Sequence, residues 1–105
     1  MDDLAGLHTQ LRREETYRNR IFTSQRKLED IERERILVTT ILERIEVTPD
    51  PEVLVSRGSF SLRLPKQIAK SVLGKDQLFL TTQADRLQKE IVDACQKLEE
   101  TERSP

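Results

Sequence analysis

The chain has 105 residues, of which 35% are charged, 35% are hydrophobic and 4% are aromatic. Ala, Glu, Lys, Leu and Arg together make up almost half of it, a share typical of coiled coils and long helices. A chain this short and polar buries little apolar surface by itself, so we expect at most one small domain over residues 1–105.

Composition and charge exclude several classes of protein. A single cysteine cannot form an internal disulfide, and no run of about 18 apolar residues is present to cross a membrane. The N-terminus is acidic where a signal peptide is basic, so we expect a protein of the cytosol or the nucleus. Lys and Arg number 18 against 19 Asp and Glu, a balance that does not suggest a nucleic-acid binder.

Residues 2–46 have the pattern of a long helix, because no proline precedes Pro49 and only Gly6 weakens the helical pattern. From Tyr17 onward, residues recur at alternating steps of four and three, the spacing of a coiled-coil seam. Ile41 beside Leu42 widens this stripe, so we expect that end of the helix to pack against more than one neighbour. The seam positions are Tyr17, Ile21, Ser24, Leu28, Ile31, Arg35, Val38, Leu42 and Ile45.

Two features interrupt this seam. Ser24 and Arg35 are polar; such residues either set the register and partner of a coiled coil or, for Arg35, reach the edge through a long side chain. Leu4, Leu7 and Leu11 precede the seam and run one residue out of step with it. A change of phase of this kind loosens the packing where it occurs.

Residues 48–64 break the helical pattern. The segment 48–51 contains two prolines and has turn chemistry. Two short apolar stretches, 53–55 and 60–64, then flank a turn that contains Gly58, which predicts a β-hairpin over 52–64. Because an isolated two-stranded hairpin is marginally stable, we expect its edges to pair with strands of partner chains.

A second helix is predicted over residues 66–101, with Pro65 in its first turn. Its seam again follows steps of four and three, and Gly74 indicates a bend or a close packing contact. The seam positions are Leu73, Gln77, Leu80, Ala84, Leu87, Ile91, Ala94 and Leu98. The predicted fold is therefore mainly α, with two long antiparallel coiled-coil helices joined by a single β-hairpin.

This architecture resembles a prefoldin subunit, and the single hairpin resembles the β type. The likeness at the level of residues lies in 52–62, where a Val-rich strand meets Gly58 and then an apolar strand; residues 75–77 are similar to the DNA damage-regulated branch of the prefoldin-like proteins. The resemblance implies a subunit of an ATP-independent chaperone without a cofactor. It implies assembly with other prefoldin-type subunits into a hetero-hexamer, and unfolded proteins as clients.

The resemblance also implies two sets of site residues. Assembly would use the hairpin residues Val53, Val55, Gly58, Phe60, Leu62 and Leu64. Clients would be held by the free ends of the coiled coil, through Leu4, Leu7, Leu11, Ile91, Ala94 and Leu98. Ordinary seam packing is the alternative role for this second set. For the whole chain, the alternative is a coiled-coil scaffold subunit of another complex, without chaperone activity.

Few residues are candidates for catalysis or metal binding. His8 is the only histidine and Cys95 the only other soft ligand, so we expect a solvent-facing histidine and a partly buried cysteine. The carboxylate pairs 14–15 and 99–100 are typical of a solvated helix face. Basic residues in 12–27 alternate with acids, a solvated or partner-facing pattern. The sequence predicts no enzyme activity, no metal, and neither nucleic acid nor membrane as a partner.

Overall fold

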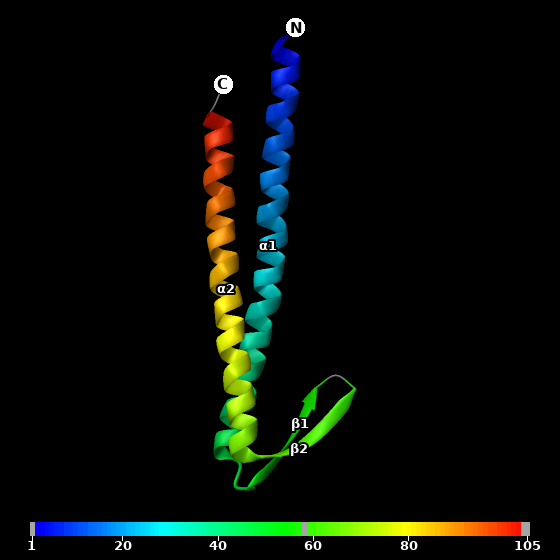
Figure 1. The fold of residues 1–105 in the computed structure, drawn as a ribbon, viewed down its shortest axis with the longest axis vertical. Helices are drawn as coiled ribbons and strands as arrows, with labels where there is room; N and C mark the ends of the chain where they lie inside the picture. Colours follow the sequence, from blue (N-terminus) through cyan, green and yellow to red (C-terminus); the bar gives the residue numbers. More distant parts are fainter. Residues whose placement is uncertain (1, 58, 104–105) are drawn as a thin grey trace. The chain divides into compact units, whose positions relative to one another are not determined.

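The computed structural model describes residues 2–57 and 59–103. Four elements follow in order: α1 (Asp2–Val47), β1 (Glu52–Arg57), β2 (Phe60–Pro65) and α2 (Lys66–Arg103). Two long helices joined by one antiparallel hairpin confirm the predicted fold class (Figure 1). The chain divides into two compact units, one of residues 31–82 and one of residues 1–30 with 83–105. Within the described ranges, neither helix has an apolar stretch long enough to span a membrane.

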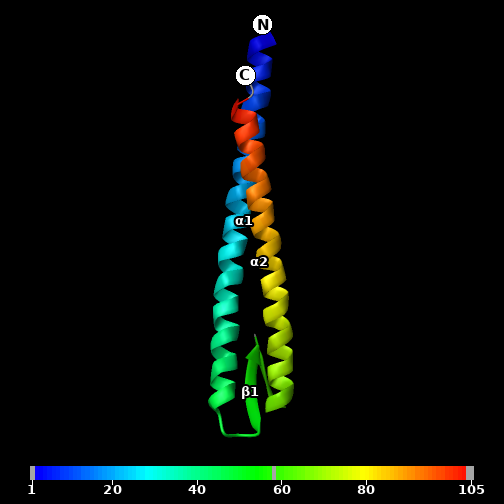
Figure 2. The same ribbon diagram turned by 90° about the vertical axis from the view of Figure 1, so that its left-hand side faces the viewer.

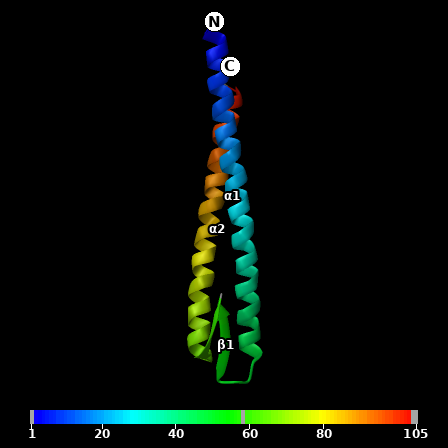
Figure 3. The ribbon, with the colours of Figure 1, turned by 90° about the vertical axis from the view of Figure 1, so that its right-hand side faces the viewer.

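The unit of residues 31–82 contains the hairpin. β1 pairs with β2 so that Val53 lies opposite Leu64 and Val55 lies opposite Leu62. Directly paired residues share a face of the sheet, so these four side chains lie on one face, together with Phe60. In Figures 2 and 3, β1 is seen between the end of α1 and the start of α2, and Figure 1 shows the hairpin projecting from these helix ends.

The core of this unit lies where the hairpin meets the helices. Val38 and Ile45 of α1 form a buried cluster with Ala69 and Leu73 of α2. The predicted contact of this end of α1 with more than one neighbour is therefore confirmed, because both α2 and the hairpin pack against it. The partly buried side chains around the cluster are Ile41, Leu42, Val53, Val55, Leu64 and Leu80.

Hydrogen bonds join the start of α2 to the segment that follows α1. The backbone N–H of Lys66 donates to the carbonyl oxygen of Pro51 at 2.8 Å, and its Nζ donates to the carbonyl oxygen of Thr48 at 2.9 Å. Since α2 begins at Lys66, the prediction that Pro65 lies in the first turn of the helix is wrong. Pro65 is the last residue of β2, opposite Glu52, and a residue without an N–H is tolerated at a strand end.

Two residues of this unit bear on alternatives that the sequence leaves open. Arg35 is half-buried on the seam, and its Nη1 donates to Oε1 of Glu32 at 2.7 Å, so its own helix holds the charged group at the edge. Gly74 lies inside α2, and nothing lies within 4 Å of the position a Cβ would take. Of the two alternatives for Gly74, a bend or a close packing contact, the packing contact is therefore wrong.

The unit of residues 1–30 and 83–105 is a pair of antiparallel helical segments (Figure 1). Every seam position that the spacing predicts in this unit is buried or half-buried, which confirms the seam. These positions are Tyr17, Ile21, Ser24 and Leu28 in α1, and Ala84, Leu87, Ile91, Ala94 and Leu98 in α2.

Candidate interaction surfaces

Three leucines in the first turns of α1 are exposed. Leu4, Leu7 and Leu11 are 76%, 53% and 54% exposed. The half-buried positions at this end are Gln10 and Glu14, which continue the frame of the seam toward the N-terminus. Leu4 and Leu11 each follow a position of this frame by one residue, whereas Leu7 lies on the frame but is exposed, so none of the three leucines packs in the seam of this structure.

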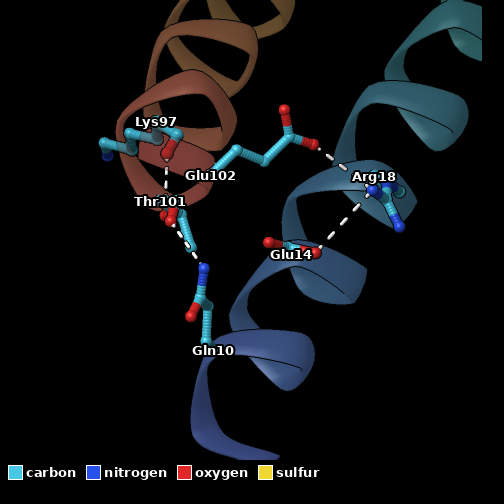
Figure 4. A network of polar contacts seen from close by, with 6 residues as sticks. All are labelled: Gln10, Glu14, Arg18, Lys97, Thr101 and Glu102. Carbon is cyan, nitrogen blue, oxygen red and sulfur yellow. Dashed lines mark hydrogen bonds and ion pairs between the residues drawn. The ribbon is translucent and has the colours of Figure 1, made fainter. Parts of the chain in front are cut away.

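Polar side chains close the seam at this end (Figure 4). Nε2 of Gln10 donates to the carbonyl oxygen of Thr101 at 3.0 Å. Nη2 of Arg18 lies 3.3 Å from Oε1 of Glu102 and 3.8 Å from Oε2 of Glu14, whose side chain is only 13% exposed. The Gln10–Thr101 and Arg18–Glu102 contacts join α1 to the last turn of α2.

The first turns of α1 also extend beyond the end of α2 (Figure 1). Gln10 contacts Thr101, and α2 ends two residues later at Arg103. Leu4 and Leu7 therefore have no stretch of α2 beside them among the described residues. Neighbouring exposed apolar side chains of this kind mark interaction sites. We call Leu4, Leu7 and Leu11 the leucine tip.

The α2 residues predicted to bind clients are placed differently. Ala94 is buried, and Ile91 and Leu98 are half-buried in the seam. Their apolar surface becomes available only when the two helical segments separate. In the closed pair, the leucine tip is exposed at this end, and Phe22 and Val92 are exposed farther along the same unit.

The hairpin presents a second apolar surface. Phe60 and Leu62 share the sheet face of Val53, Val55 and Leu64, but they are 61% and 52% exposed. The difference arises because the outer half of the hairpin lies away from the helices, whereas the other three residues pack against the core. We call Phe60 and Leu62 the hairpin surface. The predicted turn residue Gly58 lies outside the described residues.

The opposite face of the hairpin is largely polar. Ser56 and Ser61 face each other across the strands, and their Oγ atoms form a hydrogen bond of 2.8 Å. Leu54 lies on the same face, opposite Arg63. The sheet therefore has one apolar face and one mixed, mostly polar face.

An apolar stripe on α2 is absent from the sequence predictions. Ile68, Val72 and Phe79 are exposed, and their spacing of four and seven residues places them on one side of the helix, with Leu78 beside it. The same spacing argument could have found them, but they lie off the seam that the stronger pattern defines.

The structure also locates the candidate metal-binding residues. The described ranges contain no group of three or more His, Cys, Asp and Glu residues placed to hold a metal ion. His8 is exposed, as expected. Cys95 is also exposed, so the expected partial burial is wrong; it lies next to the buried seam residue Ala94 but points away from the seam.

The described elements are two long helices joined by a single β-hairpin. A comparison with solved structures finds the same arrangement. The structure is similar to that of the prefoldin beta subunit from Thermococcus strain KS-1, with a TM-score of 0.79, 20% sequence identity and coverage of 93% of each chain. The chain thus has the fold of a β-type prefoldin subunit, which confirms the resemblance at the level of fold. No model of a protein family matches the sequence, and no curated protein matches it.

Proposed function

We propose that the chain is a β-type subunit of a hetero-oligomeric prefoldin-like chaperone that holds non-native proteins without ATP. The fold supports the subunit type. The observation that supports client binding is the exposure of the leucine tip, whose three leucines lie close to the polar contacts of the seam. Uncovered apolar side chains gain free energy when the apolar residues of an unfolded chain cover them.

Assembly with other prefoldin-type subunits uses the hairpin. The sheet has only two strands, so among the described residues the outer edge of each strand has no strand beside it. A partner strand added at such an edge forms backbone hydrogen bonds, and alternate side chains give the fit. Burial of Phe60 and Leu62 then removes the apolar hairpin surface from water.

The test is a light-scattering assay of a denatured model protein diluted into the assembled complex. We expect the complex to suppress aggregation, and Leu7→Ser with Leu11→Ser to weaken the suppression. The matched control is Phe22→Ser with Val92→Ser, two apolar residues of the same unit with similar exposure. The control should retain the suppression.

A complex that assembles normally yet leaves aggregation unchanged would instead support a coiled-coil scaffold subunit. Equal losses in the two double variants would show that the leucine tip has no special role. The likeness of residues 75–77 to the DNA damage-regulated branch remains a prediction. Native mass spectrometry of the complex isolated from its own cells tests it by identifying the partner subunits.

A further inference from the structure

The register of the hairpin shows which backbone groups point to its outer edges. The backbone N–H of Lys66 donates to the carbonyl oxygen of Pro51, and these two residues continue the register in which Glu52 lies opposite Pro65. Hydrogen-bonded and non-hydrogen-bonded pairs alternate along an antiparallel ladder, so every second pair, starting with 52/65, is not hydrogen-bonded. The N–H and C=O groups of these pairs point away from the hairpin, toward its outer edges.

The two edges offer different numbers of hydrogen-bond donors. The outward residues are Glu52, Leu54 and Ser56 on β1, and Ser61, Arg63 and Pro65 on β2. The hydrogen bond of 2.8 Å between the Oγ atoms of Ser56 and Ser61 agrees with this assignment, because side chains approach most closely in non-hydrogen-bonded pairs. Pro65 has no N–H, so the edge of β1 offers one donor more than that of β2.

An open hollow accompanies the edge of β1. Its volume is about 360 Å³, and residues 52–55 line it together with residues at the end of α1. Successive residues of a strand point to opposite faces, so a hollow lined by four in a row lies along the edge of the strand rather than over one face. Among the described residues, none of β2 lines this hollow.

The lining of the hollow is apolar inside and charged outside. Its apolar residues that belong to the buried cluster or pack against it are Ile41, Ile45, Val53 and Val55. Its charged residues, all of them exposed, are Arg44, Asp50 and Glu52. An apolar centre with a polar rim is the usual anatomy of a protein interface. The hollow therefore suits a large apolar side chain that arrives with polar neighbours.

We propose that the edge of β1 and this hollow together bind a strand of a partner subunit, which places a leucine- or phenylalanine-sized side chain in the hollow. This inference rests on the proposed assembly through the hairpin and identifies the edge that selects the partner. In strand addition, backbone hydrogen bonds give affinity, and pockets for alternate side chains give specificity.

A second copy of this chain fits the hollow less well than a different partner. Its β1 has only the small side chains of Val53 and Val55 on the apolar face within 52–56. Its β2 lacks an outward N–H at Pro65, and its Leu64 packs against its own core. We therefore assign the hollow to a partner strand in which polar residues alternate with larger apolar ones.

The first experiment tests the backbone edge by competition. Equal amounts of wild-type and variant full-length chain, one of them isotopically labelled, compete for the partner subunits, and native mass spectrometry reads the ratio incorporated. Leu54→Pro removes an outward N–H and leaves the ladder to β2 intact, a position where proline is tolerated. We expect roughly tenfold lower incorporation, because a hydrogen bond is lost and the ring crowds the partner strand. Leu54→Ala retains the N–H and is the matched control, with incorporation close to that of the wild type.

The second pair of variants tests the hollow. Arg44→Trp places an apolar ring at the rim, where it covers the apolar lining and excludes the partner's side chain. We expect incorporation to fall roughly tenfold or more, the contribution of fully burying one large apolar side chain. Arg44→Gln removes the same charge without adding an aromatic ring and should be incorporated like the wild type. Circular dichroism confirms that each variant is helical.

Amide hydrogen exchange of the wild-type chain gives a measurement that needs no variant. The outward N–H groups of Leu54 and Ser56 should exchange rapidly in the chain alone. They should exchange more slowly in the assembled complex, where a partner strand accepts hydrogen bonds from them.

The possible results separate this inference from the proposed function. A chain that assembles but leaves Leu54 and Ser56 unprotected overturns the role of the β1 edge and leaves the subunit assignment intact. Equal incorporation of the two Leu54 variants, or of the two Arg44 variants, overturns it as well. Protection that appears in the chain alone and rises with its concentration assigns the edge to a second copy instead. A wild-type chain that joins no partner subunit removes the proposed assembly and this inference together.

Discussion

The ammonium group of Lys70, near the start of α2, forms an ion pair with the carboxylate of Glu46, near the end of α1. The hydrogen bond from Lys70 and its positive charge lower the pKa of Glu46 from its ordinary value of 4.5. A carboxylate whose pKa is lower in the folded state stabilises the fold above its unfolded pKa. This contribution is lost as the pH falls through the folded pKa.

The Glu46→Gln variant should therefore be less stable than the wild type at neutral pH, and the difference should shrink as the pH falls through the lowered pKa of Glu46. Urea unfolding at a series of pH values measures this. Glu43→Gln removes the same charge from an exposed position of the same helix and serves as the control. A difference that stays constant over the whole pH range would refute the role of the ion pair.

The core of residues 31–82 depends on Leu73, which is only 2% exposed. Leu73→Ala removes a side chain that contacts the buried cluster, and we expect a loss of about 2–5 kcal/mol in the free energy of unfolding. Leu78→Ala, at a position 69% exposed on the same helix, should cost less than about 0.5 kcal/mol. Chemical denaturation followed by circular dichroism gives both values, and similar costs would argue against this core.

Assembly through the hairpin surface predicts a difference between the two faces of the sheet. Phe60→Asp with Leu62→Asp introduces charge on the apolar face and should abolish the hetero-oligomer. Leu54→Asp with Ser56→Asp places the same charges on the opposite face and should leave assembly largely intact. Native mass spectrometry with the partner subunits distinguishes the two. If the variant with Phe60→Asp and Leu62→Asp still forms the hexamer, the proposed assembly site is wrong.

Gly74 offers a stabilising substitution. It lies in the interior of α2, and open space surrounds the position of a Cβ. Glycine in a helix interior costs roughly 0.5–1 kcal/mol relative to alanine, so Gly74→Ala should raise the free energy of unfolding by about this amount. Gly74→Pro at the same position should lower it by roughly 3 kcal/mol. A loss of stability in the alanine variant would mean that the glycine is needed for another reason.

Substitution of Glu14 tests the role of the polar residues that continue the seam toward the N-terminus. Its side chain is 13% exposed at a position that an apolar residue usually occupies in a coiled coil. Glu14→Leu should stabilise this end by about 1 kcal/mol through apolar burial and slow amide hydrogen exchange in residues 91–101. Glu15→Leu, on the exposed side, is the control and should leave exchange unchanged. Faster exchange in Glu14→Leu would contradict the assignment.

The seam of both helices could be predicted because burial there follows a local spacing. The steps of four and three that begin at Tyr17 place the side chains on one side of the helix, whatever the partner is. The first turns of α1 were harder to predict. Leu4, Leu7 and Leu11 have the composition of a seam, but the frame set farther along the helix places Gln10 and Glu14 there.

The hairpin shows a similar limit. Alternating apolar residues predicted both strands and the face that they share. The alternation of apolar and polar residues does not tell how far each strand residue lies from the helix ends. Val53 therefore packs against the core while Leu62, on the same face, stays exposed. That difference arises from tertiary structure, which a period of two residues does not encode.

The hydrogen-bonded hydroxyls of Ser56 and Ser61 bear on how an exposed hairpin packs against other sheets. Fibril formation needs flat sheets that stack through dry, interdigitated side chains, and a face with hydrated hydroxyls and Arg63 resists such stacking. We therefore expect the face of Ser56 and Ser61 to disfavour face-to-face stacking of this hairpin with the hairpin of another copy.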